Sequence, residues 1–210
     1  METIDQIIRE EVAQTYQKTS VSTSKAFIDG SPVDVFRALL MFYKEAVAEK
    51  GRQFVANVQT LEYIKNIAVL LTSSSCKRGI FLGGSCGNGK TTMLTAFEKM
   101  CNANGARALR TSATKMVKWH LDGHSVLDLP YQETIICIDD LGTEPAESLV
   151  YGNKVSVMSD FFEEAYKTGC FLFVTSNLGA KEIEERYGAR VRDRFREMFS
   201  SMKFSNPSFR

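Results

Sequence analysis

The sequence contains no long apolar run and no recognisable targeting segment. No stretch approaches the roughly 18 to 20 apolar residues that a membrane span needs. The amino terminus, METIDQIIREEVAQ, is acidic and polar, where a signal peptide would be basic and then apolar. We therefore expect a cytoplasmic protein with no membrane partner.

Cysteine and histidine are few and poorly spaced for metal binding. The five cysteines form no C-x-x-C pair. His120 and His124 are the only histidines, and no Cys, Asp or Glu stands at zinc-like spacing around them. Cys137 and Cys170 lie inside apolar runs, where a free thiol packs as a small hydrophobe. The sequence predicts reduced thiols, and neither a disulfide framework nor a metal site built on these residues.

An excess of one charge is also missing. Lys and Arg number 26 against 25 Asp and Glu, a formal net charge of +1 at pH 7. A general attraction to nucleic acid or to an anionic membrane is therefore not expected, and any basic surface must be local. The 210 residues, of which 44% are hydrophobic, are sufficient for one well-packed core with a short appendage.

Residues 1–52 are predicted to form a small helical appendage. Apolar residues spaced by three and four over 3–17 are typical of an amphipathic helix. A second helix is expected to begin after Ser31, a suitable N-cap followed by Pro32, and to end at Gly51. The appendage either packs against the main domain or serves as a partner-docking arm, and periodicity does not distinguish the two.

Residues 53–210 alternate between helical patterns and short apolar runs, which predicts an α/β domain with a parallel sheet covered on both faces. The runs are GIFLG (79–83), RALRT (107–111), TIICID (134–139), CFLFVTS (170–176) and SMKFS (201–205). Helices are expected over 60–72, 91–104, 112–121, 154–168 and 180–199, the last with a break at Gly188.

The segment GSCGNGKT (84–91) matches the phosphate-loop pattern G-x-x-x-x-G-K-[ST], or Walker A, between a predicted strand and a predicted helix. In such a loop the backbone amides converge on phosphate groups at the positive end of the helix. Lys90 is expected to reach the β- and γ-phosphates of ATP, and Thr91 to bind Mg²⁺. The predicted nucleotide-binding residues are Gly84, Cys86, Gly87, Asn88, Gly89, Lys90, Thr91 and Thr92.

Two further strands end in polar residues. TIICIDD delivers Asp139 to the carboxyl end of its strand, where we expect it to hold Mg²⁺ together with Thr91. Asp140 either orients or deprotonates the attacking water, or caps the following turn. The strand ending in TSN places Asn177 as a candidate to fix that water, although Asn after a strand is common in turns.

Five arginines crowd the segment ERYGARVRDRFREMF: Arg186, Arg190, Arg192, Arg194 and Arg196. One interpretation is a solvated helical face with i,i+4 pairs such as Glu182 and Arg186.

Taken in order, the phosphate loop, IDDLGTEPAE, TSNL and YGARVRDRF resemble the AAA+ superfamily over about residues 54–204. The resemblance is to the branch of bacterial helicase loaders (DnaC-like) and transposition ATPases (IstB-like). It implies a five-stranded sheet in the order 5-1-4-3-2, with Asn177 as the sensor-1 residue. It also implies that Arg194, or as runner-up Arg190, reaches the γ-phosphate in a neighbouring subunit.

Such an arginine would make hydrolysis depend on a homo-oligomer, so a lone subunit is expected to be a slow Mg²⁺-dependent ATPase. The chain departs from the superfamily in two places. Asp140 stands where many AAA+ proteins have Glu, which leaves Glu144 as a weaker candidate for activating water. Only eleven residues follow Phe199, so no C-terminal helical lid is expected.

The resemblance also implies single-stranded DNA as a partner. Arg110, Lys115 and Lys118 lie near Trp119, a composition that suits a sugar-phosphate track. Alternatively, the two lysines lie on the solvent-exposed face of a helix whose other face, with Met116 and its neighbours, packs inward.

Four functions are consistent with these motifs. We favour an ATP-binding and hydrolysing AAA+ protein that acts in DNA replication as a helicase-loader-like factor, with a replicative helicase as partner. A transposition or recombination ATPase of a mobile element would share every catalytic residue and have a transposase as partner. The third is a P-loop kinase of a small metabolite, and the fourth a module that binds ATP only as a conformational ligand. The Asp139–Asp140 pair favours an enzyme that activates water for hydrolysis over a kinase, which must exclude water from its site.

Overall fold

The structure is a computed structural model that describes residues 28, 30–129, 131, 134–150 and 153–205. The chain divides into two compact units, Met1–Cys76 and Lys77–Arg210. This boundary differs from the one expected after residue 52, because the helix predicted over 60–72 groups with the first unit. The helix predicted over 3–17 lies outside the described residues.

The first unit contains two described helices, α2 (Pro32–Ala48) and α3 (Val58–Thr72), which pack against each other. α2 begins as predicted, because the Ser31 hydroxyl accepts a hydrogen bond from the Asp34 amide at 3.2 Å. Asn57 caps α3 in the same way and accepts from the Thr60 amide at 2.7 Å. Each cap provides a partner for an amide that a helix start leaves without one.

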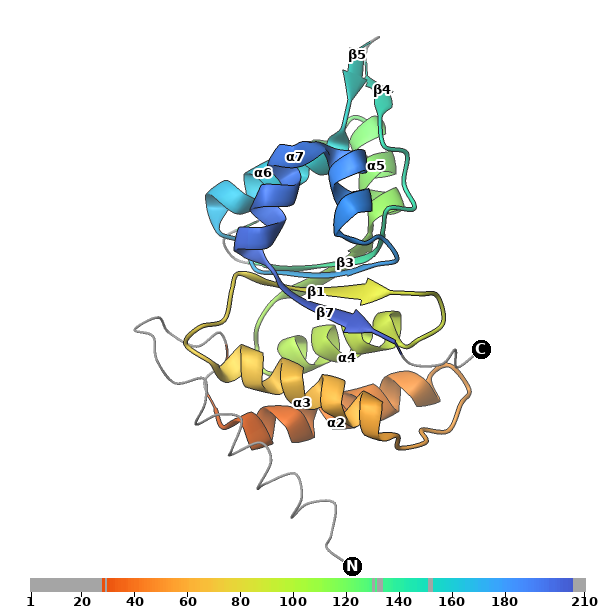
Figure 1. The fold of residues 1–210 in the computed structure, drawn as a ribbon, viewed down its shortest axis with the longest axis vertical. Helices are drawn as coiled ribbons and strands as arrows, with labels where there is room; N and C mark the ends of the chain where they lie inside the picture. Colours follow the sequence, from red (N-terminus) through yellow and green to blue (C-terminus); the bar gives the residue numbers. More distant parts are fainter. Residues whose placement is uncertain (1–27, 29, 130, 132–133, 151–152, 206–210) are drawn as a thin grey trace, which may run out of the picture. The chain divides into compact units, whose positions relative to one another are not determined.

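The second unit is built on a five-stranded parallel sheet in the order β2-β3-β6-β1-β7 (Figure 1). The strands are β1 (Gly79–Gly84), β2 (Ala108–Ser112), β3 (Ile135–Leu141), β6 (Leu172–Ser176) and β7 (Ser200–Phe204). Numbered among themselves along the chain and read from the β7 edge, they follow the order 5-1-4-3-2. The predicted sheet is therefore confirmed.

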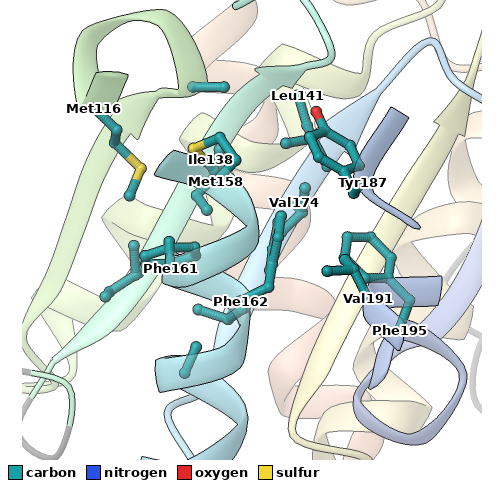
Figure 2. Packing of buried hydrophobic residues seen from close by; sticks show 14 of the residues in the cluster. Met116, Ile138, Leu141, Met158, Phe161, Phe162, Val174, Tyr187, Val191 and Phe195 are labelled. Carbon is teal, nitrogen blue, oxygen red and sulfur yellow. The ribbon is translucent and has the colours of Figure 1, made fainter. Parts of the chain in front are cut away.

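Helices cover both faces of this sheet (Figure 1). α4 (Lys90–Ala103) covers one face, and α5 (Ala113–Leu121), α6 (Val157–Thr168) and α7 (Ala180–Met198) cover the other. Successive strand residues point to opposite faces, so Phe173 stacks on Phe97 of α4 with ring centroids 4.4 Å apart, while Val174 joins the core under α6 and α7. Figure 2 shows this second core, in which Phe162 packs edge-on to Phe195 at 4.6 Å.

α7 carries the predicted break. Gly188 has φ 88° and ψ 162°, outside the helical region, so the element consists of two helical segments joined at this residue. β7 ends at Phe204, and Ser205 is the last residue that the structure describes.

The structure also contains a hairpin that the sequence analysis did not predict. The strands β4 (Ser148–Val150) and β5 (Asn153–Val155) pair antiparallel between β3 and α6, and they project from the body of the second unit (Figure 1). α6 begins at Val157, so the helix expected from residue 154 starts three residues later.

Candidate functional site: a phosphate loop at the carboxyl edge of the sheet

The phosphate loop connects β1 to α4, as its sequence predicts. Gly84 has φ 146°, and a Cβ atom at this position would lie 2.2 Å from the Phe204 carbonyl oxygen of β7. Glycine is therefore required for this close approach. The Asn88 amide donates to the same carbonyl oxygen at 2.8 Å, so the loop is anchored to the edge strand.

Lys90, the first residue of α4, folds back over this loop. Its Nζ donates to the carbonyl oxygens of Gly84 at 2.7 Å and Ser85 at 2.8 Å. It also donates to the side-chain oxygens of Asn177 at 2.9 Å and Asn88 at 3.3 Å. Burial lowers the pKa of this ammonium, and the acidic groups nearby oppose that shift. Among the described residues, the acceptors that bond Nζ are uncharged oxygens, which phosphate oxygens would outcompete.

Asn177 lies where the sequence places it, directly after β6. Its Oδ1 accepts from Lys90, and its Nδ2 donates to the Sγ of Cys86 at 3.6 Å. β6 is adjacent to β1 in the sheet, and this adjacency brings the strand-end amide to the phosphate loop. A side chain that contacts both the loop and its lysine is suited to sense a γ-phosphate.

Asp139 is the centre of the candidate metal site. Its Oδ1 accepts hydrogen bonds from the hydroxyls of Thr91 at 3.0 Å and Thr175 at 2.7 Å. The bond from Thr91 directs the free lone pairs of that hydroxyl away from the carboxylate, where a cation can bind. A hydroxyl and a carboxylate oxygen are the hard ligands that Mg²⁺ prefers, with phosphates and waters completing its shell. The residues present therefore fit Mg²⁺.

The other oxygen of Asp139 has a partner that the sequence did not reveal. Arg110 of β2 donates to Oδ2 through Nη2 at 2.9 Å, and through Nη1 to the Thr95 hydroxyl at 2.6 Å. We predicted a DNA contact for Arg110, and the structure places its guanidinium on the acidic residue of the metal site.

Asp140 adopts a left-handed conformation with φ 53°, the only described non-glycine residue with positive φ. The pairing register of β3 with β6 shifts between Ile138 and Leu141, so this residue sits in an irregularity of the strand. Its amide donates to the Thr175 hydroxyl at 3.0 Å, and its carbonyl accepts from Thr143 at 2.8 Å. Both the amide and the carbonyl of Asp140 are therefore held by hydrogen bonds, and its side chain is exposed at the edge of the site.

Glu144 lies away from this edge and is buried, with 2% of its surface exposed. Its carboxylate accepts from the Gly142 amide at 2.8 Å, from Arg186 Nε at 3.4 Å and from the Tyr187 hydroxyl. Burial and the nearby carboxylate raise the pKa of Tyr187. These contacts fasten the loop after Asp140 to α7 and direct the carboxylate into the protein.

The Glu144 contacts also correct the pairing expected along α7. Arg186 does not use Glu182 as its i,i+4 partner but contacts Glu144. Glu182 instead accepts from the Gly179 amide at 2.6 Å and caps the start of the helix.

Arg194 lies at the end of the sheet opposite its own phosphate loop. Its guanidinium stacks 3.9 Å above the ring of Tyr166 and pairs with Glu197 at 3.7 Å. Near the same end of α7, the Arg196 carbonyl oxygen accepts a hydrogen bond from Lys77 Nζ at 2.7 Å. Lys77 lies just before β1, whereas the phosphate loop follows the far end of that strand. A six-residue strand spans roughly 20 Å. The fold therefore does not bring Arg194 to the site of its own subunit.

Three further predicted residues, Arg190, Lys115 and Lys118, are on the surface. Arg190 pairs with Glu163 at 2.8 Å and has a side chain that is 74% exposed. Lys115 and Lys118 are exposed on α5, and Met116 of the same helix is buried, which confirms that this face packs inward. None of the helices in the described part of the chain is long and apolar enough to span a membrane.

Comparisons with known proteins agree with the fold. No protein-family model matches the chain, and no curated protein matches it. Among solved structures, a structure of DnaI is similar with a TM-score of 0.58 and 19% identity, over 89% of this chain and 96% of that one. A DnaC helicase loader is similar with a TM-score of 0.57 and 18% identity, over 78% of this chain and 98% of that one.

A replication initiator DnaA bound to AMPPCP and single-stranded DNA is also similar, with a TM-score of 0.52 and 17% identity, over 78% of this chain and 51% of that one. At these identities the likeness defines the fold alone. The second unit has the P-loop fold of the AAA+ type, and its phosphate loop has the sequence and surroundings of a nucleotide site.

Proposed function

We propose that the chain binds and hydrolyses ATP with Mg²⁺ and acts in DNA replication as a helicase-loader-like factor on single-stranded DNA. The observation that carries the proposal is the meeting of Lys90, Asn177 and the Asp139–Thr91 pair around one phosphate loop. The similarity to a DnaC helicase loader and to DnaA bound to AMPPCP and single-stranded DNA supports the choice of process.

Each residue then has a distinct part in the reaction. Mg²⁺, when bound, would neutralise charge on the phosphates, and Thr91 and Asp139 are the residues that would hold it. Lys90 binds phosphate oxygens, while Asp140 orients the attacking water or accepts its proton. Asn177 fixes the same water. Positioning and charge stabilisation are what phosphoryl transfer requires of a protein.

Arg194 completes the site of a neighbouring subunit. Its position far from the phosphate loop of its own subunit supports this role, and Arg190 is the alternative because its side chain reaches solvent. An arginine supplied by a neighbour contributes roughly 10³- to 10⁵-fold in rate. A monomer is therefore a slow ATPase, and the rate of ATP hydrolysis per subunit rises when subunits assemble.

DNA contacts fall to Lys115 and Lys118, which are exposed on α5. Arg110 remains a candidate for the same role if it leaves Asp139. Residues 1–52 are proposed to dock the partner protein.

Phosphate release by the purified full chain, measured over a range of protein concentrations with and without single-stranded DNA, tests the proposal. We expect turnover per subunit to rise with concentration and with DNA, and to vanish in Lys90→Ala. A panel of small metabolites serves as acceptor control. A turnover that depends neither on protein concentration nor on DNA, together with transfer of phosphate to a metabolite, would show that the chain is a kinase.

A further inference from the structure

Arg110 makes contacts that the proposed function leaves unexplained. Its guanidinium links the Asp139 carboxylate to Thr95 on α4, with nitrogen–oxygen distances of 2.9 and 2.6 Å. The Asp139 side chain is 12% exposed and that of Arg110 is 31% exposed, so the pair is partly shielded from water. Such a bond between charged groups is stronger than a surface ion pair.

The sheet enforces this contact. β2 pairs parallel with β3, so Arg110 lies opposite Cys137, and Ser112 lies opposite Asp139. Arg110 and Asp139 thus stand two positions apart on neighbouring strands, within reach of a long side chain. Thr95 is itself fixed, because its hydroxyl donates to the Thr91 carbonyl at 2.9 Å. The guanidinium therefore joins β2, β3 and α4 at one point.

The contact changes the charge of the candidate metal site. Asp139 and Asp140 supply two carboxylates at the carboxyl edge of the sheet, and Lys90 and Arg110 supply two cations beside them. A cluster with balanced charge attracts a divalent cation weakly. The phosphates of a bound nucleotide would add several negative charges and restore the attraction.

We propose that Arg110 is a positioning residue of the metal site, which holds the Asp139 carboxylate toward Thr91 and weakens Mg²⁺ binding by its positive charge. Bound nucleotide offsets this effect, so Mg²⁺ enters together with phosphate and not alone. This inference rests on the proposed function, because it assumes that the loop binds a nucleotide and Mg²⁺.

The size of the effect follows from the charge. The Arg110 side chain keeps 31% of its surface exposed, so water still screens its charge strongly, and removing one such charge several ångströms from a divalent cation changes the affinity for the cation by about tenfold. Arg110→Gln removes the charge and keeps a polar side chain. The hydroxyls of Thr91 and Thr175 continue to hold Asp139 in this variant, so the site keeps its ligands.

The test measures Mg²⁺ affinity directly. A fluorescent ADP analogue is bound to the full chain in EDTA, and Mg²⁺ is then titrated to half-saturation of the fluorescence change. We expect Arg110→Gln to lower the half-saturating Mg²⁺ concentration by about tenfold. Arg107→Gln is the matched control, because it removes the same charge from an exposed arginine just before β2. Its midpoint should equal that of the wild type.

Arg110→Lys separates charge from geometry and is available if the glutamine variant does not fold. Lysine keeps the charge but not the two-pronged contact, so its midpoint should lie near the wild-type value. A midpoint that does not fall in Arg110→Gln, or that falls equally in Arg110→Lys, would overturn the inference. If the wild-type protein binds no ADP analogue with or without Mg²⁺, the proposed function itself fails.

Discussion

Replacing Tyr187 by Phe removes the single hydroxyl that α7 donates to the buried carboxylate of Glu144. The Glu144 side chain has no exposed surface and Tyr187 is 6% exposed, so water cannot replace the lost bond. A hydrogen bond to a buried charged group contributes about 1.5 to 3 kcal/mol. We therefore expect Tyr187→Phe to lower the free energy of unfolding by about 2 kcal/mol.

For a chain of this length, about 2 kcal/mol corresponds to a fall in Tm of roughly 4 to 8 °C. Thermal and urea denaturation followed by circular dichroism measure the change. The matched control is Tyr166→Phe, which removes the same hydroxyl from an exposed bond to Glu197 and should leave Tm nearly unchanged. If Tyr187→Phe is no less stable than Tyr166→Phe, the Glu144 cluster does not fasten the loop to α7.

Three other perturbations test the site and the fold. Thr175→Val removes the hydroxyl that links the Asp139 carboxylate to the Asp140 amide. Misplacement of these groups should lower ATP turnover roughly 10- to 100-fold with little loss of ATP affinity. Thr175→Ser keeps the hydroxyl and should retain the activity. Gly84→Ala places a Cβ atom 2.2 Å from a β7 carbonyl oxygen, and we expect it to abolish nucleotide binding in a fluorescence titration while Gly51→Ala, which meets nothing within 4 Å, retains it. Burial raises the pKa of Tyr43 from 10.0 to about 12. The contribution of its neutral form to the stability of the folded state is therefore complete below pH 10 and is lost as pH rises from about 10 to 12. Denaturation curves should show a smaller alkaline loss of stability in Tyr43→Phe than in the wild type.

The sheet and the phosphate loop could be predicted because their signals are local. The strands are short apolar runs separated by helical patterns, and the loop pattern needs only its own residues to place Lys90 and Thr91 at a helix start. Gly188 likewise breaks α7 within its own sequence. The hairpin β4–β5 was missed because its strands are only three residues long each, and because β5 overlaps the start of the helix expected over 154–168.

The contacts that define the site could not be predicted in the same way. Arg110 reaches Asp139 only because β2 lies beside β3 in register, and sequence spacing does not reveal which strands are neighbours. Glu144 and Arg186 are 42 residues apart, whereas the i,i+4 rule considers only neighbours on one helix. Both cases involve charged side chains whose partner comes from a distant element.

The central claim is that one subunit supplies the arginine that another subunit needs. The most direct test mixes two inactive variants, Arg194→Ala and Asp140→Asn, and measures phosphate release. In the mixture, an Asp140→Asn subunit donates its intact Arg194 to the intact loop of an Arg194→Ala subunit. We predict that the mixture recovers part of the wild-type rate although each variant alone is inactive. A mixture as inactive as its components, at concentrations where the wild-type protein turns over, would contradict the account.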